Sequence, residues 1–433
     1  MKNTVFIIGL GAAGLMAAGS ASEAGASVTG LERNPQPGRK VLISGKGRCN
    51  VTNSGDLQDF IQAFGKKGQF LYGALTRFTR DDLLSFFSRA GVETITERGG
   101  RIFPASELST DILKALVKYA LAHEAKLCYS CPVERIVVAK GKVTGVISSN
   151  GQMAASAVIL TAGGSSYPGT GSDGSGYRLA REAGHTIITP LPSLTSLETA
   201  EAWVPKLQGL SLKNVEITLR IRGKAVETKF GEMIFTHYGI SGPIVLDMSR
   251  TLVEATRPEL EKALQPQNPF QKALHVPPES EISLNLKPAL SIEQLTARLQ
   301  RDFDTGGKKF YASILKDLLP ASLIPVIIDL SKIPRDKPGN QISKAERDHL
   351  IKLLTDLRMT VNGLRSFGEA IVTSGGVDLK EVDPRTMESK LIKGLYFAGE
   401  VLDLDAKTGG YNLQAAFSTG YLAGLNAAGS LSV

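Results

Sequence analysis

The 433-residue sequence contains few cysteines, few histidines and no long apolar segment. Its three cysteines (Cys49, Cys128 and Cys131) are too few for a disulfide framework, which favours a reducing, cytoplasmic location. The five histidines show no metal-ligand spacing with cysteines or acidic residues, so no metal site is predicted. No apolar run is long enough to span a bilayer, so no membrane segment is expected. The length is sufficient for two or three domains.

Long runs of cationic residues are also absent, although the formal net charge is +8 and the pI is near 9.2. This charge is compatible with binding to nucleic acid or to an anionic substrate. However, only short pairs such as Lys66–Lys67 and Lys308–Lys309 occur. A solvated basic surface around an anionic cofactor is therefore the simpler interpretation, and we do not expect a nucleic-acid partner.

Near the N-terminus, the apolar segment Val5–Ile8 is followed by Gly9-Leu10-Gly11-Ala12-Ala13-Gly14 and then by a helical pattern. In such an order of strand, turn and helix, Gly9 permits the tight turn, Gly11 lets the backbone approach a pyrophosphate, and Gly14 lets the helix pack on the strand. The first helical amides would face the phosphate charge. The pattern predicts a dinucleotide site at Gly9, Gly11, Ala12, Ala13 and Gly14.

A second predicted strand, Ala26–Leu31, ends at Glu32, a position from which a carboxylate can bind an adenosine ribose. An acid at this position favours FAD or NAD over NADP. The adjacent Arg33 is also predicted to be a cofactor-binding residue. A purely structural turn and the apolar part of a signal peptide are the alternatives. Interrupting glycines and the strand that follows at once argue against a signal peptide.

A second glycine-rich segment lies near the other end of the chain. The predicted strand Leu395–Gly399 delivers Glu400 to a strand end, where a carboxylate can bind the ribityl hydroxyls of a flavin. Gly409–Gln414 then opens a helix whose first amides would stabilise negative charge on the pyrimidine end of an isoalloxazine. This layout resembles the FAD-binding end of two-dinucleotide-type flavoproteins. An amphipathic terminal helix after a glycine turn is the alternative.

The middle of the chain has a different pattern from its two ends. Residues 1–190 alternate strands and helices, as a doubly wound α/β sheet requires, and β-rich sequence returns from Glu369. In between, Asn214–Arg222 and Ala225–Phe235 predict an antiparallel hairpin, and Ile292–Leu357 is mostly helical in period. Glu254–Pro278 is polar and contains prolines, which predicts an exposed excursion. The middle is therefore interpreted as an insertion.

Two helix starts are also predicted. Ser109 or Thr110 would cap a helix over Ser109–Ala120, and Pro243 would begin another helix.

Four further segments carry a specific resemblance: Pro37–Asn53, Gly163–Gly174, Phe235–Pro243 and Thr373–Val377. With them, nearly the whole chain resembles the BaiN/YhiN-type flavoproteins, also described as aminoacetone oxidase-like NAD(P)/FAD-dependent oxidoreductases. The resemblance implies a discontinuous Rossmann-like FAD-binding domain (1–190 and 365–433). It also implies an inserted β-barrel-like domain (191–290) with a small helical part (291–364).

The resemblance also implies further cofactor-binding residues. Ala12, Ala13 and Glu32 would hold the ADP half, and Val133 would offer its backbone to the adenine. Surface charge is the alternative role for Arg39, Lys40 and Arg48. The remaining assigned positions are Arg39 and Lys40 near the phosphates, Ser44, Cys49 and Asn50 along the flavin, Ala162, Gly163 and Gly399 at strand ends, and Glu400, Asn412 and Leu413 at the ribityl chain and ring.

Several residues leave a catalytic role open. His237 or Tyr238 would protonate a substrate if the insert covers the flavin, and a structural histidine is the alternative. Cys128-x-x-Cys131 has the spacing of a redox dithiol but lies in a strand-like segment, which favours packing. Packing is also favoured for Cys49. Gly169-x-Gly171-x-x-Gly174 is better explained as a loop than as a second dinucleotide fold, because no strand directly precedes it.

Taken together, these patterns predict a cytoplasmic oxidoreductase with non-covalently bound FAD. NAD(P)H is the expected transient reductant, and the partner is a small organic substrate. Reduction of an activated C=C bond and oxidation of a small amine are both compatible with this prediction. A flavin-dependent RNA-modifying or RNA-binding protein and a non-catalytic flavin sensor are the alternative functions. The sequence gives no prediction for the oligomeric state.

Overall fold

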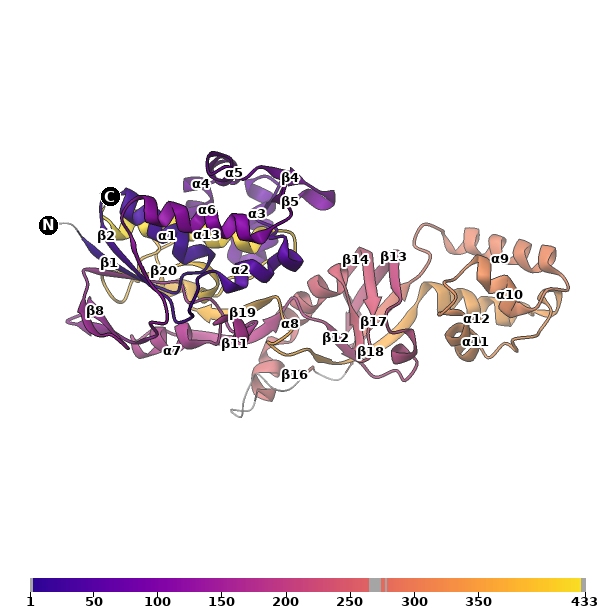
Figure 1. Ribbon diagram of the computed structural model, residues 1–433. Coiled ribbons are helices and arrows are strands. Elements are labelled where there is room, and N and C mark those ends of the chain that lie inside the picture. The colour runs from indigo at the N-terminus through magenta and orange to yellow at the C-terminus, as the bar shows by residue number, and fades with distance from the viewer. Residues whose placement is uncertain (1–2, 265–273, 277–278, 430–433) are drawn as a thin grey trace. The chain divides into compact units, whose positions relative to one another are not determined.

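The computed structural model describes residues 3–264, 274–276 and 279–429 (Figure 1). The chain divides into two compact units. Met1–Ser193 and Phe367–Val433 form the first, here called the split unit because both ends of the chain contribute to it. Leu194–Ser366 forms the second, here called the inserted unit. Each unit is described by itself.

The split unit is built on a five-stranded parallel sheet in the order β20-β10-β1-β2-β6. Strands of such a sheet are apolar on both faces, and Val5, Ile7 and the other residues of the central strand after Thr4 are buried. The last strand along the chain pairs with β10, so the C-terminal segment completes the sheet that the N-terminus begins. The α/β, Rossmann-like prediction is confirmed. The strands are β1 Thr4–Ile8, β2 Ser27–Leu31, β6 Lys126–Cys128, β10 Ala157–Leu160 and β20 Leu395–Phe397.

The first and last helices, α1 (Ala12–Glu23) and α13 (Tyr411–Ala427), lie next to each other (Figure 1), and glycines of α13 allow a close contact. A Cβ atom at Gly420 would lie 2.3 Å from the Ala13 carbonyl oxygen, and one at Gly424 would lie 2.1 Å from Ser20 Oγ. The two helices therefore run in the same direction. At 1.5 Å per residue, α13 begins about 12 Å before the start of α1.

Smaller elements surround the main sheet. Two three-stranded antiparallel sheets have the orders β3-β5-β4 and β7-β8-β9, and β11 pairs with β19 as an antiparallel ribbon. Ser193 lies opposite Val372 in this ribbon, so the chain leaves the split unit and returns to it at neighbouring points. The strands are β3 Thr52–Asn53, β4 Thr94–Thr96, β5 Arg101–Pro104, β7 Val133–Ala139, β8 Lys142–Ser148, β9 Gly151–Ala154, β11 Ile187–Ser193 and β19 Val372–Val377. The other helices are α2 Arg39–Ile43, α3 Leu57–Ala63, α4 Tyr72–Arg77, α5 Arg80–Arg89, α6 Ser109–Ala122 and α7 Ser175–Glu182.

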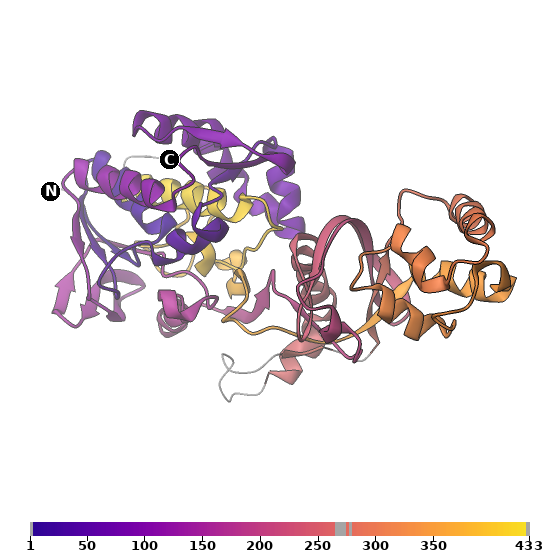
Figure 2. The ribbon, with the colours of Figure 1, turned by 45° about the vertical axis from the view of Figure 1, so that its right-hand side comes forward.

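The inserted unit contains a six-stranded antiparallel barrel. The strand order is β12-β15-β14-β13-β17-β18, and β18 closes the barrel by pairing with β12. The predicted hairpin is confirmed as β13 and β14, and helices α9–α12 lie together beside the strands (Figures 1 and 2). The strands are β12 Leu197–Thr199, β13 Ser211–Ile221, β14 Lys224–Phe235, β15 Gly239–Ser241, β16 Leu274–His275, β17 Ser280–Asn285 and β18 Leu357–Leu364. The helices are α8 Pro243–Ala263, α9 Ile292–Gly306, α10 Tyr311–Ile314, α11 Ile324–Ser331 and α12 Lys344–Thr355.

Two local predictions are wrong, although α8 does begin at Pro243 as predicted. The expected excursion over 254–278 is helical as far as Ala263, because Thr256 (φ −120°, ψ 15°) leaves the helical conformation and accommodates Pro258. Residues 265–273 and 277–278 of this excursion lie outside the described residues. Ser109 is the first helical residue of α6, not its cap, and its hydroxyl donates to the Leu42 carbonyl oxygen over 2.8 Å.

Candidate active site at the carboxyl edge of the parallel sheet

All five strands of the parallel sheet point the same way, so the segments that follow them meet at one edge. The edge carries the glycine loop after β1, Glu32 after β2 and the segment through Val133 after β6. It also carries Ala162 and Gly163 after β10, and Gly399 and Glu400 after β20. The structure thus brings together residues that lie nearly 400 positions apart in the sequence.

The glycine loop leaves the start of α1 open. Gly9 has φ 94°, and a Cβ atom at Gly14 would lie 1.9 Å from the Gly9 carbonyl oxygen, so both positions require glycine. A Cβ atom at Gly11, in contrast, would meet no protein atom within 4 Å. No side chain caps α1, and no acidic residue lies in its first turn. The first amides of α1 are therefore available to an anionic ligand.

Glu32 is almost fully buried, with 6% of its surface exposed, and it joins β2 to the glycine loop. Its Oε2 accepts a hydrogen bond from the Leu10 amide over 2.8 Å. Its Oε1 accepts two bonds from Asn34, one from the backbone amide (2.9 Å) and one from Nδ2 (2.8 Å). The Cys131 amide donates to the Glu32 carbonyl oxygen over 2.8 Å, which places the start of β7 at Val133 close to this acid.

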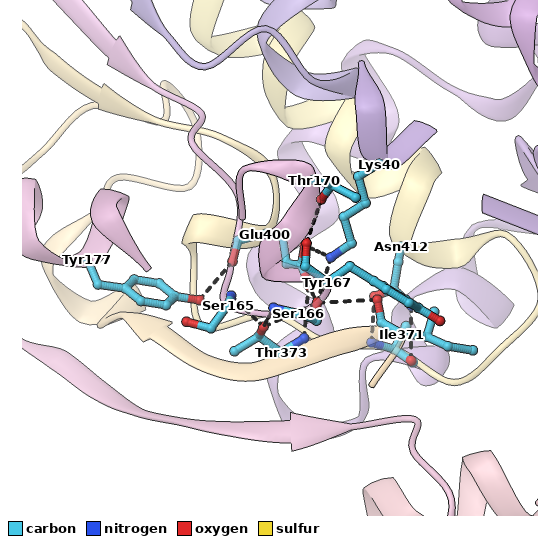
Figure 3. Close-up of polar contacts among 11 residues, drawn as sticks. Lys40, Ser165, Ser166, Tyr167, Thr170, Tyr177, Ile371, Thr373, Glu400 and Asn412 are labelled. Carbon is cyan, nitrogen blue, oxygen red and sulfur yellow. Dashed lines mark hydrogen bonds and ion pairs between the residues drawn. The ribbon is translucent and has the colours of Figure 1, made fainter. Parts of the chain in front are cut away.

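A polar cluster surrounds Glu400 (Figure 3). Lys40 Nζ lies 2.7 Å from Glu400 Oε2 and donates to Ser166 Oγ over 2.6 Å. Glu400 Oε1 accepts from Ser166 Oγ (3.0 Å) and from the Thr373 amide (2.9 Å). The Tyr177 hydroxyl donates to the Glu400 carbonyl oxygen over 3.4 Å. Lys40, predicted near phosphates, is therefore held by the acid predicted at the ribityl chain.

Sequence reasoning did not assign Ser166 or Thr373 to the site. Thr373 Oγ1 accepts from the backbone amides of Ser165 (2.8 Å) and Ser166 (3.1 Å), which fixes the serine loop against β19 (Figure 3). Both residues lie in segments that carried the family resemblance. Serine and threonine are so common in loops that their spacing alone carried no signal.

The loop over residues 164–174 extends from the Glu400 cluster to the Glu32 region. At its far end, Asn34 Nδ2 donates to the Thr170 carbonyl oxygen over 3.1 Å, and Arg33 forms an ion pair with Asp173. Gly174 then precedes α7. The described residues contain only one parallel sheet, so the glycine pattern of this loop does not open a second dinucleotide fold.

The start of α13 is a second helix terminus without a side-chain cap or an acidic first turn. A Cβ atom at Gly410 would lie 2.3 Å from the Thr52 carbonyl oxygen, so glycine is required there. Asn412 Oδ1 accepts from the Ala406 amide over 2.9 Å, and its Nδ2 donates to the Ala406 carbonyl oxygen over 3.1 Å. The Asn412 side chain thus anchors the preceding loop, and the adjacent Leu413 is half-buried.

The segment from α2 to Asn50 is held by hydrogen bonds within itself and to neighbouring elements. Ser44 Oγ donates to the Val41 carbonyl oxygen over 2.7 Å, Asn50 Oδ1 accepts from the Ile102 amide over 3.2 Å, and Arg39 donates to Asn34 Oδ1 over 3.1 Å. Cys49 is fully buried, and this burial raises the pKa of its thiol to about 12. The thiol is therefore protonated at neutral pH and packs in the core.

The side chains of the remaining candidate residues take no part in the hydrogen bonds described above. Cys128 ends β6, and Cys131 lies in the short segment between β6 and β7; both are free thiols, and neither is at a helix start. In the inserted unit, the His237 and Tyr238 rings are in contact, with centroids 4.8 Å apart. The Arg365 guanidinium lies 4.3 Å from the centroid of the Tyr238 ring. Their catalytic role stays a prediction.

Two kinds of feature are absent from the described part of the chain. No helix there has both the length and the apolar character needed to cross a membrane. No group of three or more histidine, cysteine, aspartate or glutamate side chains there is arranged to hold a metal ion.

Comparison with known proteins identifies relatives along the whole chain. A family model described as the HI0933-like protein Rossmann domain matches residues 3–426. A 3-dehydro-bile acid delta(4,6)-reductase of Clostridium scindens is 33% identical over 430 residues, which are 98% of this chain and 99% of the relative. A ribosomal RNA dihydrouridine synthase of Haemophilus influenzae is 32% identical over 425 residues, 97% of each chain.

Solved structures give a similar result for the fold alone. The 3-ketosteroid delta1-dehydrogenase of Sterolibacterium denitrificans aligns with a TM-score of 0.50 and 13% identity, over 99% of this chain and 100% of that one. The family resemblance inferred from the sequence motifs is confirmed by the match over residues 3–426.

Proposed function

Because the chain belongs to the HI0933-like Rossmann family, we propose that it is an FAD-dependent oxidoreductase that reduces a carbon–carbon double bond conjugated to a carbonyl group. The names of the two relatives both describe reactions at such a double bond. A delta(4,6)-reductase of a 3-dehydro bile acid acts on double bonds that are conjugated with a ketone. Dihydrouridine differs from uridine by two hydrogens across a ring double bond next to a carbonyl.

The observation that carries the proposal is the pair of open helix starts at one sheet edge. The amides of α1 suit a pyrophosphate, and the absence of any protein atom near a Cβ at Gly11 leaves room for it. The start of α13, about 12 Å further out, suits a second site of negative charge. A flavin dinucleotide has both features, whereas a structural turn requires neither.

The residues at the edge would divide the binding between them. Ala12 and Ala13 would donate backbone amides to the pyrophosphate, and Glu32 would accept from the adenosine ribose beside Val133. Glu400 has lone pairs beyond those used by Lys40, Ser166 and Thr373, so it can accept from the ribityl hydroxyls. When bound, FAD supplies hydride transfer through N5 of its ring.

Reduction of the double bond also needs a proton. Hydride adds to the carbon distant from the carbonyl, and the carbon next to the carbonyl then takes a proton from an acid. We keep His237 and Tyr238 as candidate donors of this proton and NAD(P)H as the source of the hydride. A cytoplasmic location also remains a prediction.

A second candidate function has the same chemistry with uridine in RNA as the substrate. The name of the relative from Haemophilus influenzae favours it, and a pI near 9.2 is compatible with an RNA partner. The two candidate functions differ only in the substrate that carries the double bond, which is a small molecule in the first and a uridine of RNA in the second.

The first experiment measures the cofactor. The purified protein should show a flavin absorption spectrum that bleaches anaerobically with NADH or NADPH. Glu32→Ala should lose FAD, whereas Glu134→Ala, a matched change at an exposed position on β7, should retain it. A colourless protein that takes up no added FAD would overturn the proposal.

The second experiment separates the substrates. The reduced protein is incubated with a 3-oxo-4,6-diene steroid or with ribosomal RNA that lacks the modification. A mass gain of two hydrogens identifies the substrate. If neither compound nor any simple enone is reduced while the flavin turns over with oxygen, the double-bond assignment is wrong.

A further inference from the structure

Two surface segments of the inserted unit run side by side between helices. The Tyr311 amide donates to the Lys337 carbonyl oxygen over 2.9 Å, and the Gly339 amide donates to the Lys309 carbonyl oxygen over 3.0 Å. Phe310 pairs with Pro338 as an antiparallel bridge. These backbone contacts fix the loop after α9 against the loop after α11.

The side chains on these loops combine one exposed ring with several cations. Phe310 is 55% exposed. Lys308, Lys309, Lys332 and Arg335 are exposed and form no ion pair within the described residues. We call Phe310 and these four cations the basic aromatic patch. Lys337 beside it is paired with Glu346 over 2.7 Å, and Asp336 is the only acid within the two loops.

This combination is unfavourable for the protein alone. A half-exposed phenyl ring forgoes much of the free energy of burial, and like charges close together repel one another. A lone exposed apolar residue is ordinary, and so is a lone lysine pair. An exposed ring on two paired loops that also carry unpaired cations instead matches a partner that has both planar apolar faces and regularly spaced negative charges.

We propose that the basic aromatic patch binds a single-stranded stretch of RNA, with a base stacked on Phe310 and phosphates contacted by Lys308, Lys309 and Arg335. Base stacking on an aromatic side chain beside a cationic track is how proteins hold single strands. A membrane surface would need a larger apolar face than one ring. The inference rests on the RNA-directed candidate function.

The test uses the full-length, FAD-loaded protein and a fluorescent single-stranded RNA of about 12 nucleotides, with binding measured by anisotropy at two salt concentrations. Phe310→Ala should weaken binding about ten-fold or more, and Phe310→Trp should restore it, because stacking requires only an aromatic face. Lys308→Glu with Lys309→Glu should weaken binding and reduce the salt slope by about 1.4, or about 0.7 for each lost phosphate contact.

The matched control is Lys114→Glu with Lys118→Glu, which makes the same charge change at two exposed positions on α6. It should leave binding near the wild-type value. FAD content and unfolding midpoint should be unchanged in every variant. Equal binding by wild type and Phe310→Ala would overturn the proposal, as would equal loss in the control or equal affinity for inorganic polyphosphate or an acidic peptide.

The outcome is separable from that of the proposed function. If the patch variants lose RNA binding but wild type reduces no uridine, the substrate assignment fails and the patch stands. If wild type reduces uridine in RNA and the Lys308→Glu, Lys309→Glu variant does so with unchanged kcat/KM, the function stands and the patch is refuted.

Discussion

Gly11 and Gly14 lie three residues apart in the glycine loop, but the structure predicts opposite consequences of replacing them with alanine. At Gly11 (φ −83°, ψ −161°) the backbone is open to any residue, and the added methyl group meets no protein atom within 4 Å. The reduced entropy of the unfolded chain stabilises the variant by about 0.4–1 kcal/mol, and the weaker N-cap costs a similar amount. The free energy of unfolding of the apo-protein should therefore change by less than about 1 kcal/mol.

FAD binding should nevertheless suffer in Gly11→Ala, because the methyl group would occupy the space that a pyrophosphate needs. Loss of one hydrogen bond to a charged group costs about 1.5–3 kcal/mol, which corresponds to about 10- to 150-fold weaker binding. In Gly14→Ala the methyl carbon would lie 1.9 Å from the Gly9 carbonyl oxygen and 2.7 Å from Thr161 Oγ1. Such overpacking should destabilise the apo-protein by about 1–3 kcal/mol or more.

Urea unfolding of the two apo-proteins measures the first effect, and titration with FAD, followed by quenching of flavin fluorescence, measures the second. The reasoning is refuted if Gly11→Ala binds FAD as tightly as wild type, since Gly11 would then not line the cofactor. It is also refuted if Gly14→Ala is as stable as wild type, since the close approach of α1 to the glycine loop would then be absent.

Three other predictions concern packing and titration in the split unit. Gly424→Ala should lower the free energy of unfolding by about 1–3 kcal/mol, measured with urea, because its methyl group would lie 2.1 Å from Ser20 Oγ; an unchanged midpoint would contradict the close helix contact. Burial lowers the pKa of His185, so below about pH 6.5 the unfolded chain binds a proton at this histidine more readily than the folded chain does. The free energy of unfolding should therefore decrease as the pH is lowered below about 6.5. His185→Gln should reduce this pH dependence of the urea midpoint, and an identical dependence would exclude His185 as its source. Since burial raises the pKa of Cys49 to about 12, iodoacetamide at mildly alkaline pH should modify the half-buried Cys128 first, as peptide mass mapping can show; earlier labelling of Cys49 would show that its loop opens.

The sequence was most informative where local pattern determines structure. The glycine loop and Glu32 were recognisable because strand, turn, helix and acid follow each other within about 30 residues, the context that the motif requires. The β13–β14 hairpin was recognisable from its alternation. Both depend on neighbours along the chain.

The rest depends on partners that are distant in sequence. Lys40 and Glu400 are 360 residues apart, and nothing near either one indicates the other. Serine is a common helix-capping residue, but Ser109 is the first helical residue of α6, and its hydroxyl donates to the Leu42 carbonyl oxygen instead of capping the helix. Pro258 ordinarily ends a helix, yet α8 continues because Thr256 absorbs the distortion. Pattern alone could not weigh these tertiary contacts.

The close packing of α1 against α13 also sets an order of events during synthesis. Roughly 400 residues separate the two helices, so at ordinary translation rates α1 would wait about 20–80 s for the strand and helix that cover it. Over that interval the face of α1 that carries Ala13, Ala17 and Ser20 is uncovered on the nascent chain, while the inserted unit has all of its own sequence available. A ribosome that stops before residue 411 would release a chain that contains the whole sequence of the inserted unit but lacks α13, the helix that covers α1. Chaperones and proteases that act on nascent chains would encounter the surface of α1 that α13 has not yet covered.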